Sequence, residues 1–222
     1  MDEAIPSLNT PYGLGEDNYK LIKDFLKNRN IKNILEFGSG NSTVRLAHDF
    51  QSSSITSIEQ SEKYYKETSS LLNSYDINNA VVKYCPLKVI SVGKLRLFLT
   101  YDLNKCDNSS DIDFVLIDGP VEHQTVRGRE GVLYQIFSNI NQNGIIALDD
   151  YHRENSKQTV QNWINTYRDQ LRIVQEYDNI VILKKEVSNT SYSYPGFSSV
   201  VDNWKSIIYM LKRNRKQLSS LF

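Results

Sequence analysis

Two carboxylates and a pair of glycines stand at a spacing that can bind a nucleotide. Glu36 lies near the end of one apolar run, and Gly38, Ser39 and Gly40 follow that run. A second apolar run ends in Glu59, about 20 residues further on. Glycines let the backbone approach a ligand closely, and the second acid can accept both hydroxyls of a ribose. The pattern predicts a β-α-β unit that binds a ligand where its strands end.

The loop excludes two other kinds of nucleotide site. A dinucleotide loop has a third glycine where this chain has Thr43, and no G-x-x-x-x-G-K-[ST] phosphate loop occurs in the sequence. Glu36 stands just before the turn, where it would repel a pyrophosphate and suit a cation. The ligand is therefore expected to be a nucleoside that carries a positive charge rather than a polyphosphate.

The sequence E-x-G-x-G-x-S followed by a strand-terminal Glu resembles the S-adenosylmethionine loop of class I methyltransferases. The resemblance implies that Glu36 lies near the methionine ammonium and that Glu59 holds the ribose. The cofactor-binding residues that it implies are Glu36, Gly38, Ser39, Gly40, Ser42 and Glu59. A glycine turn in an unrelated α/β domain remains the alternative.

Three further acids follow two later apolar runs. Asp118 ends one run, and Asp149 and Asp150 end the next. Adjacent parallel strands would bring these carboxylates to one edge, where they repel one another unless a positive charge compensates them. Oxygen ligands of this kind suit Mg²⁺ or a related hard cation. The structural alternative is that one Asp caps a helix and another pairs with Arg127 or Arg153.

An acid after the fourth strand and an acidic pair after the fifth are similar to the metal-dependent O-methyltransferases of the catechol and macrolide-sugar types. The resemblance implies Mg²⁺ or Mn²⁺ bound by Asp118, Asp149 and Asp150, although the catechol type has Asn where this chain has Asp150. The expected catalytic residues are Asp149, Asp118 and His152. The imidazole of His152 could accept a proton from a substrate hydroxyl, being poised near neutral pH, or it could be an exposed loop side chain.

Two arginines lie in the segment that would cover a substrate. Arg127 and Arg129 could bind a carboxylate or phosphate of the acceptor. We expect them instead to be simple surface charges.

Alternating strand and helix patterns position these residues. Strands are predicted over 33–37, 55–59, 80–84, 113–118 and 145–149, with helices between them and an inserted strand or hairpin within 89–101. Residues 171–177 and 180–184 flank the turn Asp178-Asn179 and can only be antiparallel. The fold class expected is α/β: a Rossmann-like, doubly wound, mostly parallel sheet with a C-terminal antiparallel hairpin strand, an ending that also looks like the class I methyltransferase fold.

The chain divides into three predicted parts. Residues 1–30 form an N-terminal arm and helix, residues 31–186 the S-adenosylmethionine-binding domain, and residues 187–222 a connector and a C-terminal amphipathic helix. That helix, over about 200–216, carries Trp204, Ile207 and Leu211 on one face and basic residues at its end. We expect it to pack on its own domain or on a second copy, with a membrane surface as the alternative.

Composition limits the partners. The chain has 222 residues and a formal net charge of +0, so no strong field favours nucleic acid. No segment is apolar and long enough to span a bilayer, and the acidic start lacks the apolar stretch of a signal peptide. Cys85 and Cys106 do not form a metal-type pair, so free thiols in a reducing cytoplasm are expected.

These observations together favour an S-adenosylmethionine-dependent methyltransferase acting on oxygen of a small or sugar-like acceptor. The sequence has no Ser-His-Asp or Cys-His nucleophile system, and methyl transfer from a sulfonium does not require one. Two alternatives remain open: an aminopropyltransferase-like enzyme on the same scaffold, and a non-catalytic S-adenosylmethionine-binding module.

Overall fold

The computed structural model describes residues 6–8, 13–92, 96–106, 109–122, 125, 128–187 and 208. Its centre is a seven-stranded sheet in the order β3-β2-β1-β6-β7-β9-β8. Pairing is parallel from β3 through β7 and antiparallel for β9 and β8. This arrangement confirms the predicted fold class.

The strands are β1 Asn33–Phe37, β2 Ser54–Glu59, β3 Ala80–Tyr84, β4 Leu87–Val92, β5 Arg96–Tyr101, β6 Ile112–Ile117, β7 Ile140–Asp149, β8 Leu171–Glu176 and β9 Ile180–Lys185. The helices are α1 Glu16–Leu26, α2 Asn41–Asp49, α3 Glu62–Ser74, α4 Leu103–Cys106, α5 Gly128–Ile136 and α6 Glu154–Tyr167, with 3₁₀ turns η2 Phe137–Asn139 and η3 Arg168–Gln170. Among the described residues, no helix has the length and apolar character needed to cross a membrane.

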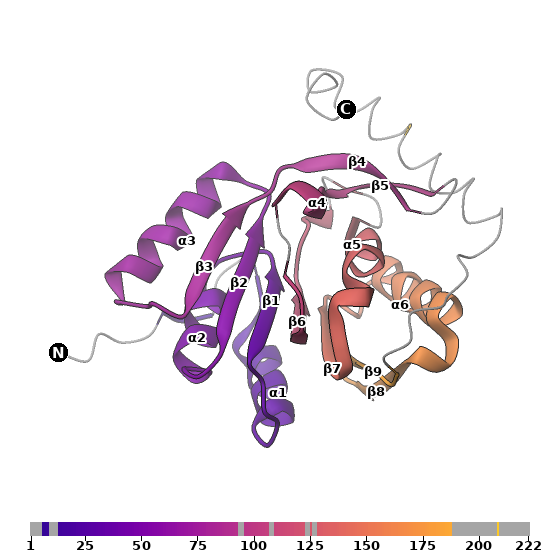
Figure 1. Cartoon of the computed structure of the whole chain (residues 1–222), viewed down its shortest axis with the longest axis horizontal. Helices are drawn as coiled ribbons and strands as arrows, with labels where there is room; N and C mark the ends of the chain where they lie inside the picture. Colours follow the sequence, from indigo (N-terminus) through magenta and orange to yellow (C-terminus); the bar gives the residue numbers. More distant parts are fainter. Residues whose placement is uncertain are drawn as a thin grey trace.

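Both faces of the sheet are covered (Figure 1). In β6, Phe114 and Leu116 pack in the cluster with α1 and α2, whereas Val115 and Ile117 pack in the cluster with α5 and α6. A strand buried on both faces reads as a continuous apolar run, which is why β6 was recognisable from sequence alone. The helices on both faces leave only the ends of the strands free for a site.

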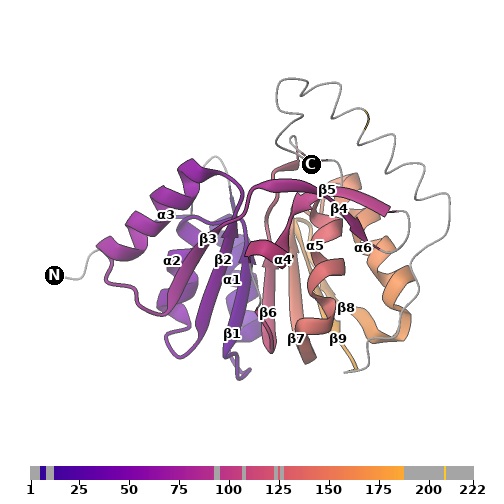
Figure 2. The same ribbon diagram turned by 45° about the horizontal axis from the view of Figure 1, so that its top comes forward.

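The inserted segment forms the antiparallel hairpin β4–β5 as a separate two-stranded sheet. Figure 2 shows the hairpin crossing above the main sheet, close to α4 and α5. The short helix α4 follows β5.

A disulfide joins Cys85, directly after β3, to Cys106 in α4, with the two Cα atoms 5.6 Å apart. The prediction of free thiols is therefore wrong: the hairpin returns the chain to its starting point and brings two distant cysteines together. The cytoplasmic location, which the sequence predicts on this ground, loses that support and stays a prediction.

The C-terminal helix predicted over about 200–216 lies outside the described residues except for Ile208, which is helical and 47% exposed. Its packing against protein, and the boundaries of the three predicted parts, stay predictions.

Candidate active site

The glycine loop turns sharply between β1 and α2. Gly38 has φ +95°, a conformation that L side chains rarely adopt, and a Cβ placed there would lie 3.2 Å from the backbone nitrogen of Gly119. A Cβ on Gly119 would meet the hydroxyl of Tyr101 and lie 3.0 Å from the Gly38 nitrogen. Two backbones therefore approach each other where β1 and β6 end, and both positions require glycine.

Glu36 lies beneath this loop with no exposed surface. Ser42 Oγ and Thr43 Oγ1 each donate to one of its carboxylate oxygens, both at 2.5 Å. Burial raises the pKa of Glu36 to about 7, although these hydroxyls lower it. The predicted cofactor residues Glu36 and Ser42 thus contact each other and fix the first turn of α2.

Glu59 ends β2 beside the loop and is 5% exposed. Its Oε2 accepts from the backbone nitrogen of Ser39 at 3.0 Å and from Ser39 Oγ at 3.2 Å. Its Oε1 accepts from the backbone nitrogen of Ser61 at 2.7 Å. The structure brings Glu59 and the loop together, as the sequence predicts, and the hydrogen-bond donors to this carboxylate within the described part of the chain are neutral.

The three aspartates also meet. One carboxylate oxygen from each of Asp118, Asp149 and Asp150 lies within 4.8 Å of the others. The strands β6 and β7 place the first two, and Asp150 follows in a left-handed conformation, φ 60°, which Asp tolerates. We call this group the acid edge.

Arg129, from the first turn of α5, lies among these acids. Its Nη2 is 3.0 Å from Asp150 Oδ2 and 3.3 Å from Asp118 Oδ1, and it donates to the Asp118 carbonyl oxygen at 2.5 Å. Its Nη1 donates to the Asp149 carbonyl oxygen at 2.9 Å. The side chain is only 11% exposed, so the prediction of a simple surface charge is wrong for Arg129.

Two other side chains complete the acid edge. Arg153 Nη2 lies 3.0 Å from Asp150 Oδ1, and Asn18 of α1 donates to Asp149 Oδ1 at 2.7 Å. Burial raises the pKa of Asp118 to about 8, because loss of water and the neighbouring aspartates outweigh Arg129. Burial and Asp150 likewise raise the pKa of Asp149. The acid edge can therefore hold a proton near neutral pH.

The side chain of His152 does not contact the acid edge within the described residues and pairs with the turn between β8 and β9 instead. It is exposed, and its Nδ1 pairs with Asn179 Oδ1 in the turn between β8 and β9. Arg127 lies outside the described residues. The structural alternative, an aspartate paired with Arg127 or Arg153, agrees with the ion pair between Asp150 and Arg153. The pairing with Arg129 was not part of that alternative.

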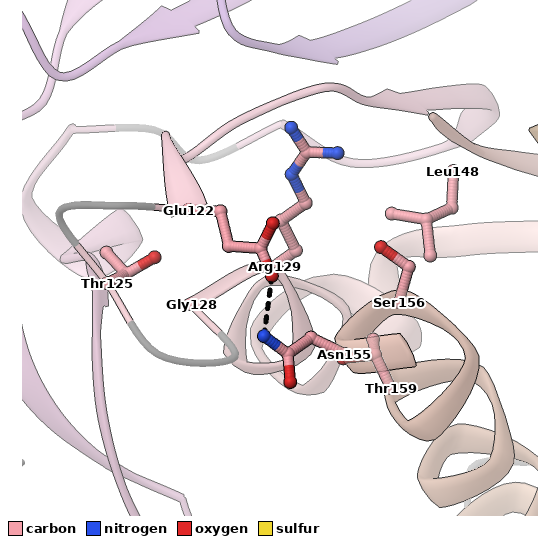
Figure 3. Close-up of a pocket in the computed structure, with 8 residues that line it drawn as sticks. All are labelled: Glu122, Thr125, Gly128, Arg129, Leu148, Asn155, Ser156 and Thr159. Carbon is pink, nitrogen blue, oxygen red and sulfur yellow. Dashed lines mark hydrogen bonds between the residues drawn. The ribbon is translucent and has the colours of Figure 1, made fainter. Parts of the chain in front are cut away.

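A small pocket lies behind Arg129, between the starts of α5 and α6. Glu122 and Asn155 line it and are joined by a 2.6 Å hydrogen bond, and Figure 3 shows the guanidinium of Arg129 extending away from that pair. Arg153 Nη1 also donates to Glu122 at 2.8 Å, so the pocket is linked to the acid edge.

Solved structures with the same architecture include methyltransferases. An O-methyltransferase from Bacillus cereus in complex with S-adenosylhomocysteine (SAH) has a TM-score of 0.59 at 14% identity, over 80% of this chain and 84% of that one. A protein from Staphylococcus aureus that is described as a caffeoyl-CoA O-methyltransferase has a TM-score of 0.53 at 18% identity, over 78% of this chain and 85% of that one. The chain has the class I methyltransferase fold.

A methyltransferase of another kind shares this fold: a precorrin-6y C5,15-methyltransferase from Geobacter metallireducens has a TM-score of 0.55 at 11% identity, over 82% of this chain and 94% of that one. No protein-family model matches the sequence, and no curated protein is significantly similar to it. These likenesses establish the fold, and the site must supply the argument for function.

Proposed function

We propose that this protein is an enzyme that transfers a methyl group from S-adenosylmethionine to a hydroxyl oxygen of a small-molecule or sugar-like acceptor. The observation that carries the proposal is Glu59 at the end of β2, held against the glycine loop by Ser39. A carboxylate in this place suits the two hydroxyls of a ribose. Neighbours of the same fold include O-methyltransferases and one protein in complex with SAH.

The cofactor lies across the ends of β2, β1 and β6 in this proposal. The adenosine part is bound at Glu59, and the methionine part passes over Gly38 toward the acid edge. Glu36 does not contact the cofactor in this proposal, because both of its carboxylate oxygens accept hydrogen bonds from hydroxyls of α2 and none of its surface is exposed. Its task is to fix the loop whose backbone faces the ligand, together with Ser39, Gly40 and Ser42.

The acid edge receives the acceptor. Methyl transfer from a sulfonium requires mainly alignment and exclusion of water, and an acceptor hydroxyl must lose its proton. Asp118, whose pKa is about 8, and Asp149 are the groups that accept it. His152 is a weaker candidate than these two, because it is exposed and pairs with Asn179 in the hairpin turn.

The divalent cation expected from the sequence would compete with Arg129 for the carboxylates of the acid edge. The donor set suits Mg²⁺ or Mn²⁺, since three carboxylates converge. However, the Arg129 guanidinium is already bound among them, and Arg153 takes the remaining oxygen of Asp150. The residues do not fit a metal ion while Arg129 is in place. We propose that Arg129 supplies the positive charge and that transfer does not depend on a metal.

Titration with S-adenosylhomocysteine tests the cofactor site. Hydrogen bonds to charged groups contribute about 1.5–3 kcal/mol, so Glu59→Ala should weaken binding at least tenfold. Glu62→Ala removes an exposed carboxylate of the neighbouring helix α3 and serves as the matched control, with unchanged affinity. Equal affinities of Glu59→Ala and wild type would refute the role of Glu59, and absence of binding to the wild type would refute the proposed function.

The reaction is tested with methyl-labelled S-adenosylmethionine and a panel of sugar, catechol and amine acceptors. The proposal expects label on hydroxyl oxygen. Transfer of an aminopropyl group from the decarboxylated cofactor would establish the aminopropyltransferase alternative. Tight cofactor binding without turnover over the whole panel would favour a binding module. The C-terminal helix as a contact between two copies belongs to the same proposal and is checked by the mass of the protein in solution with and without residues 200–222.

A further inference from the structure

Tyr101 is a buried side chain at the proposed cofactor site that comes from the inserted hairpin. It ends β5, is 1% exposed, and packs against Phe37 of β1 with the ring centroids 5.5 Å apart. Figure 2 shows β5 crossing above the end of the main sheet. The hairpin therefore inserts one aromatic ring into the place where β1 and β6 end.

The hydroxyl of Tyr101 lies beside the point where the backbones of Gly38 and Gly119 approach each other. It is the first atom that a Cβ on Gly119 would meet, and the nitrogen and Cα of Gly38 are the next, at 3.0 and 3.2 Å. The side chain is thus aimed at the gap over which the methionine part of the cofactor is proposed to pass.

No hydrogen bond of this hydroxyl is seen among the described residues, and it is not one of the fully enclosed polar atoms without a partner there. Buried tyrosine hydroxyls usually have a partner, because a polar group taken out of water without one is costly. Other buried tyrosines of the chain follow that rule: Tyr134 donates to Glu130 at 3.0 Å, and Tyr19 donates to Asp49 at 2.8 Å. Tyr101 differs from these two tyrosines, and it lies at the proposed ligand site.

Charged groups surround the hydroxyl. Glu59, Asp118 and Glu36 on one hand and Arg129 on the other act on it electrostatically, and burial raises its pKa well above the ordinary value. The phenol therefore stays protonated, and its hydrogen is available to an acceptor. The methionine carboxylate of the cofactor is such an acceptor, and it would be the ligand's negatively charged group in this gap.

We propose that Tyr101 is a cofactor-binding residue whose hydroxyl donates a hydrogen bond to the methionine carboxylate of S-adenosylmethionine. The inference rests on the proposed function. It assigns the inserted hairpin a role in the site: β4 and β5 bring a donor to the amino-acid end of the ligand, while Glu59 of the main sheet holds the ribose.

The test compares two ligands in one variant. Tyr101→Phe removes only the hydroxyl. S-adenosylhomocysteine has the amino-acid part, and 5′-methylthioadenosine lacks it. Calorimetric titration should show that Tyr101→Phe weakens S-adenosylhomocysteine binding roughly ten- to a hundredfold and leaves 5′-methylthioadenosine binding unchanged. The melting temperature of the unliganded variant should equal or exceed that of the wild type, because no hydrogen bond of the lost hydroxyl is seen among the described residues.

Tyr134→Phe is the matched control, since its hydroxyl has a protein partner in Glu130. That variant should melt at a lower temperature and bind both ligands as the wild type does. Unchanged S-adenosylhomocysteine affinity in Tyr101→Phe, or equal weakening of both ligands, would overturn the assignment of Tyr101. Failure of the wild type to bind S-adenosylhomocysteine would instead overturn the proposed function, so the two failures are distinct.

Discussion

Two groups of acids at one edge of the sheet are stabilised by different chemistry. Glu36 and Glu59 receive hydroxyls and backbone N–H groups, and each has its own donors. At the acid edge, by contrast, Asp118 and Asp150 are held by the guanidinium of Arg129. Neutral donors therefore hold Glu59 against the loop and leave its negative charge for a ligand, whereas the largely buried Arg129 compensates the charge of several acids and joins them into one unit.

The largest effect should come from the shared cation. Arg129→Met leaves largely buried carboxylates without compensation, and breaking a buried ion pair in this way costs about 3–5 kcal/mol of unfolding free energy. Arg153 is 40% exposed, so Arg153→Met should cost less than about 1 kcal/mol. Denaturant unfolding of both variants measures the difference. Equal losses would show that the acid edge does not depend on Arg129.

Arg129→Met also tests whether the acid edge can bind a metal ion. The wild type should bind no Mn²⁺ in calorimetric titration, and its melting temperature should not change with chelator. The folded fraction of Arg129→Met should gain Mn²⁺ binding, because its three carboxylates then lack a cation. Mn²⁺ binding by the wild type, with methyl transfer that chelator abolishes, would restore the metal-dependent interpretation.

The disulfide should have the next largest effect. Cys106→Ser opens a covalent loop with a sequence separation of 21, and a loop of this size contributes about 3 kcal/mol. Cys85 donates its backbone N–H to the Glu59 carbonyl at 2.7 Å, so cofactor affinity should fall as well. Thermal melting with and without reductant checks this: the wild type should become less stable on reduction, and Cys106→Ser should not respond. A wild type indifferent to reductant would contradict it.

Asp149→Asn should separate catalysis from binding. Loss of a general base costs about a hundredfold or more in rate, whereas the ligand contacts lie on the side of Glu59. The asparagine oxygen can still accept from Asn18, so the fold should persist. Initial rates with labelled S-adenosylmethionine and an accepted substrate are compared with S-adenosylhomocysteine affinity. A parallel loss of both would place Asp149 in the cofactor site instead.

The smallest expected effect is a pH dependence of the unfolding free energy that arises from Glu36. The pKa of Glu36 is raised from 4.5 to about 7, so its protonated form stabilises the fold below about pH 4.5, and that stability is lost as the pH rises through 7. The unfolding free energy should fall across this range by roughly 1–3 kcal/mol more in the wild type than in Glu36→Gln. Identical pH profiles would show that Glu36 does not titrate in this range.

Much of the fold was readable because local patterns agreed with it. The bounds of β1 and β3 match the predicted ranges, since each is a short apolar run between turn residues. Ser61, a residue type that commonly begins helices, is the N-cap of α3 and accepts from the Tyr64 nitrogen. The convergence of Asp118 and Asp149 followed from parallel pairing of β6 and β7, which sets their ends at one edge.

Contacts between distant residues could not be read in this way. The helix α5 ends at Ile136, and the buried Lys185 of β9 donates to the carbonyl oxygens of Phe137 and Ile140 at 2.8 and 2.7 Å. A lysine so far along the chain gives no local signal. The role of Arg129 and the disulfide depend likewise on how α5 and the inserted hairpin are placed, and Tyr101 was one of 14 tyrosines.

A crystal structure of the complex with S-adenosylhomocysteine would show directly whether the ligand binds as proposed. We expect the ribose hydroxyls on Glu59, the sulfur over the place where Gly38 and Gly119 approach each other, and the acid edge with Arg129 on the far side of the sulfur, where an acceptor would enter. A ligand bound with its ribose away from Glu59, or with its sulfur remote from Asp118 and Asp149, would contradict the proposed site and the function built on it.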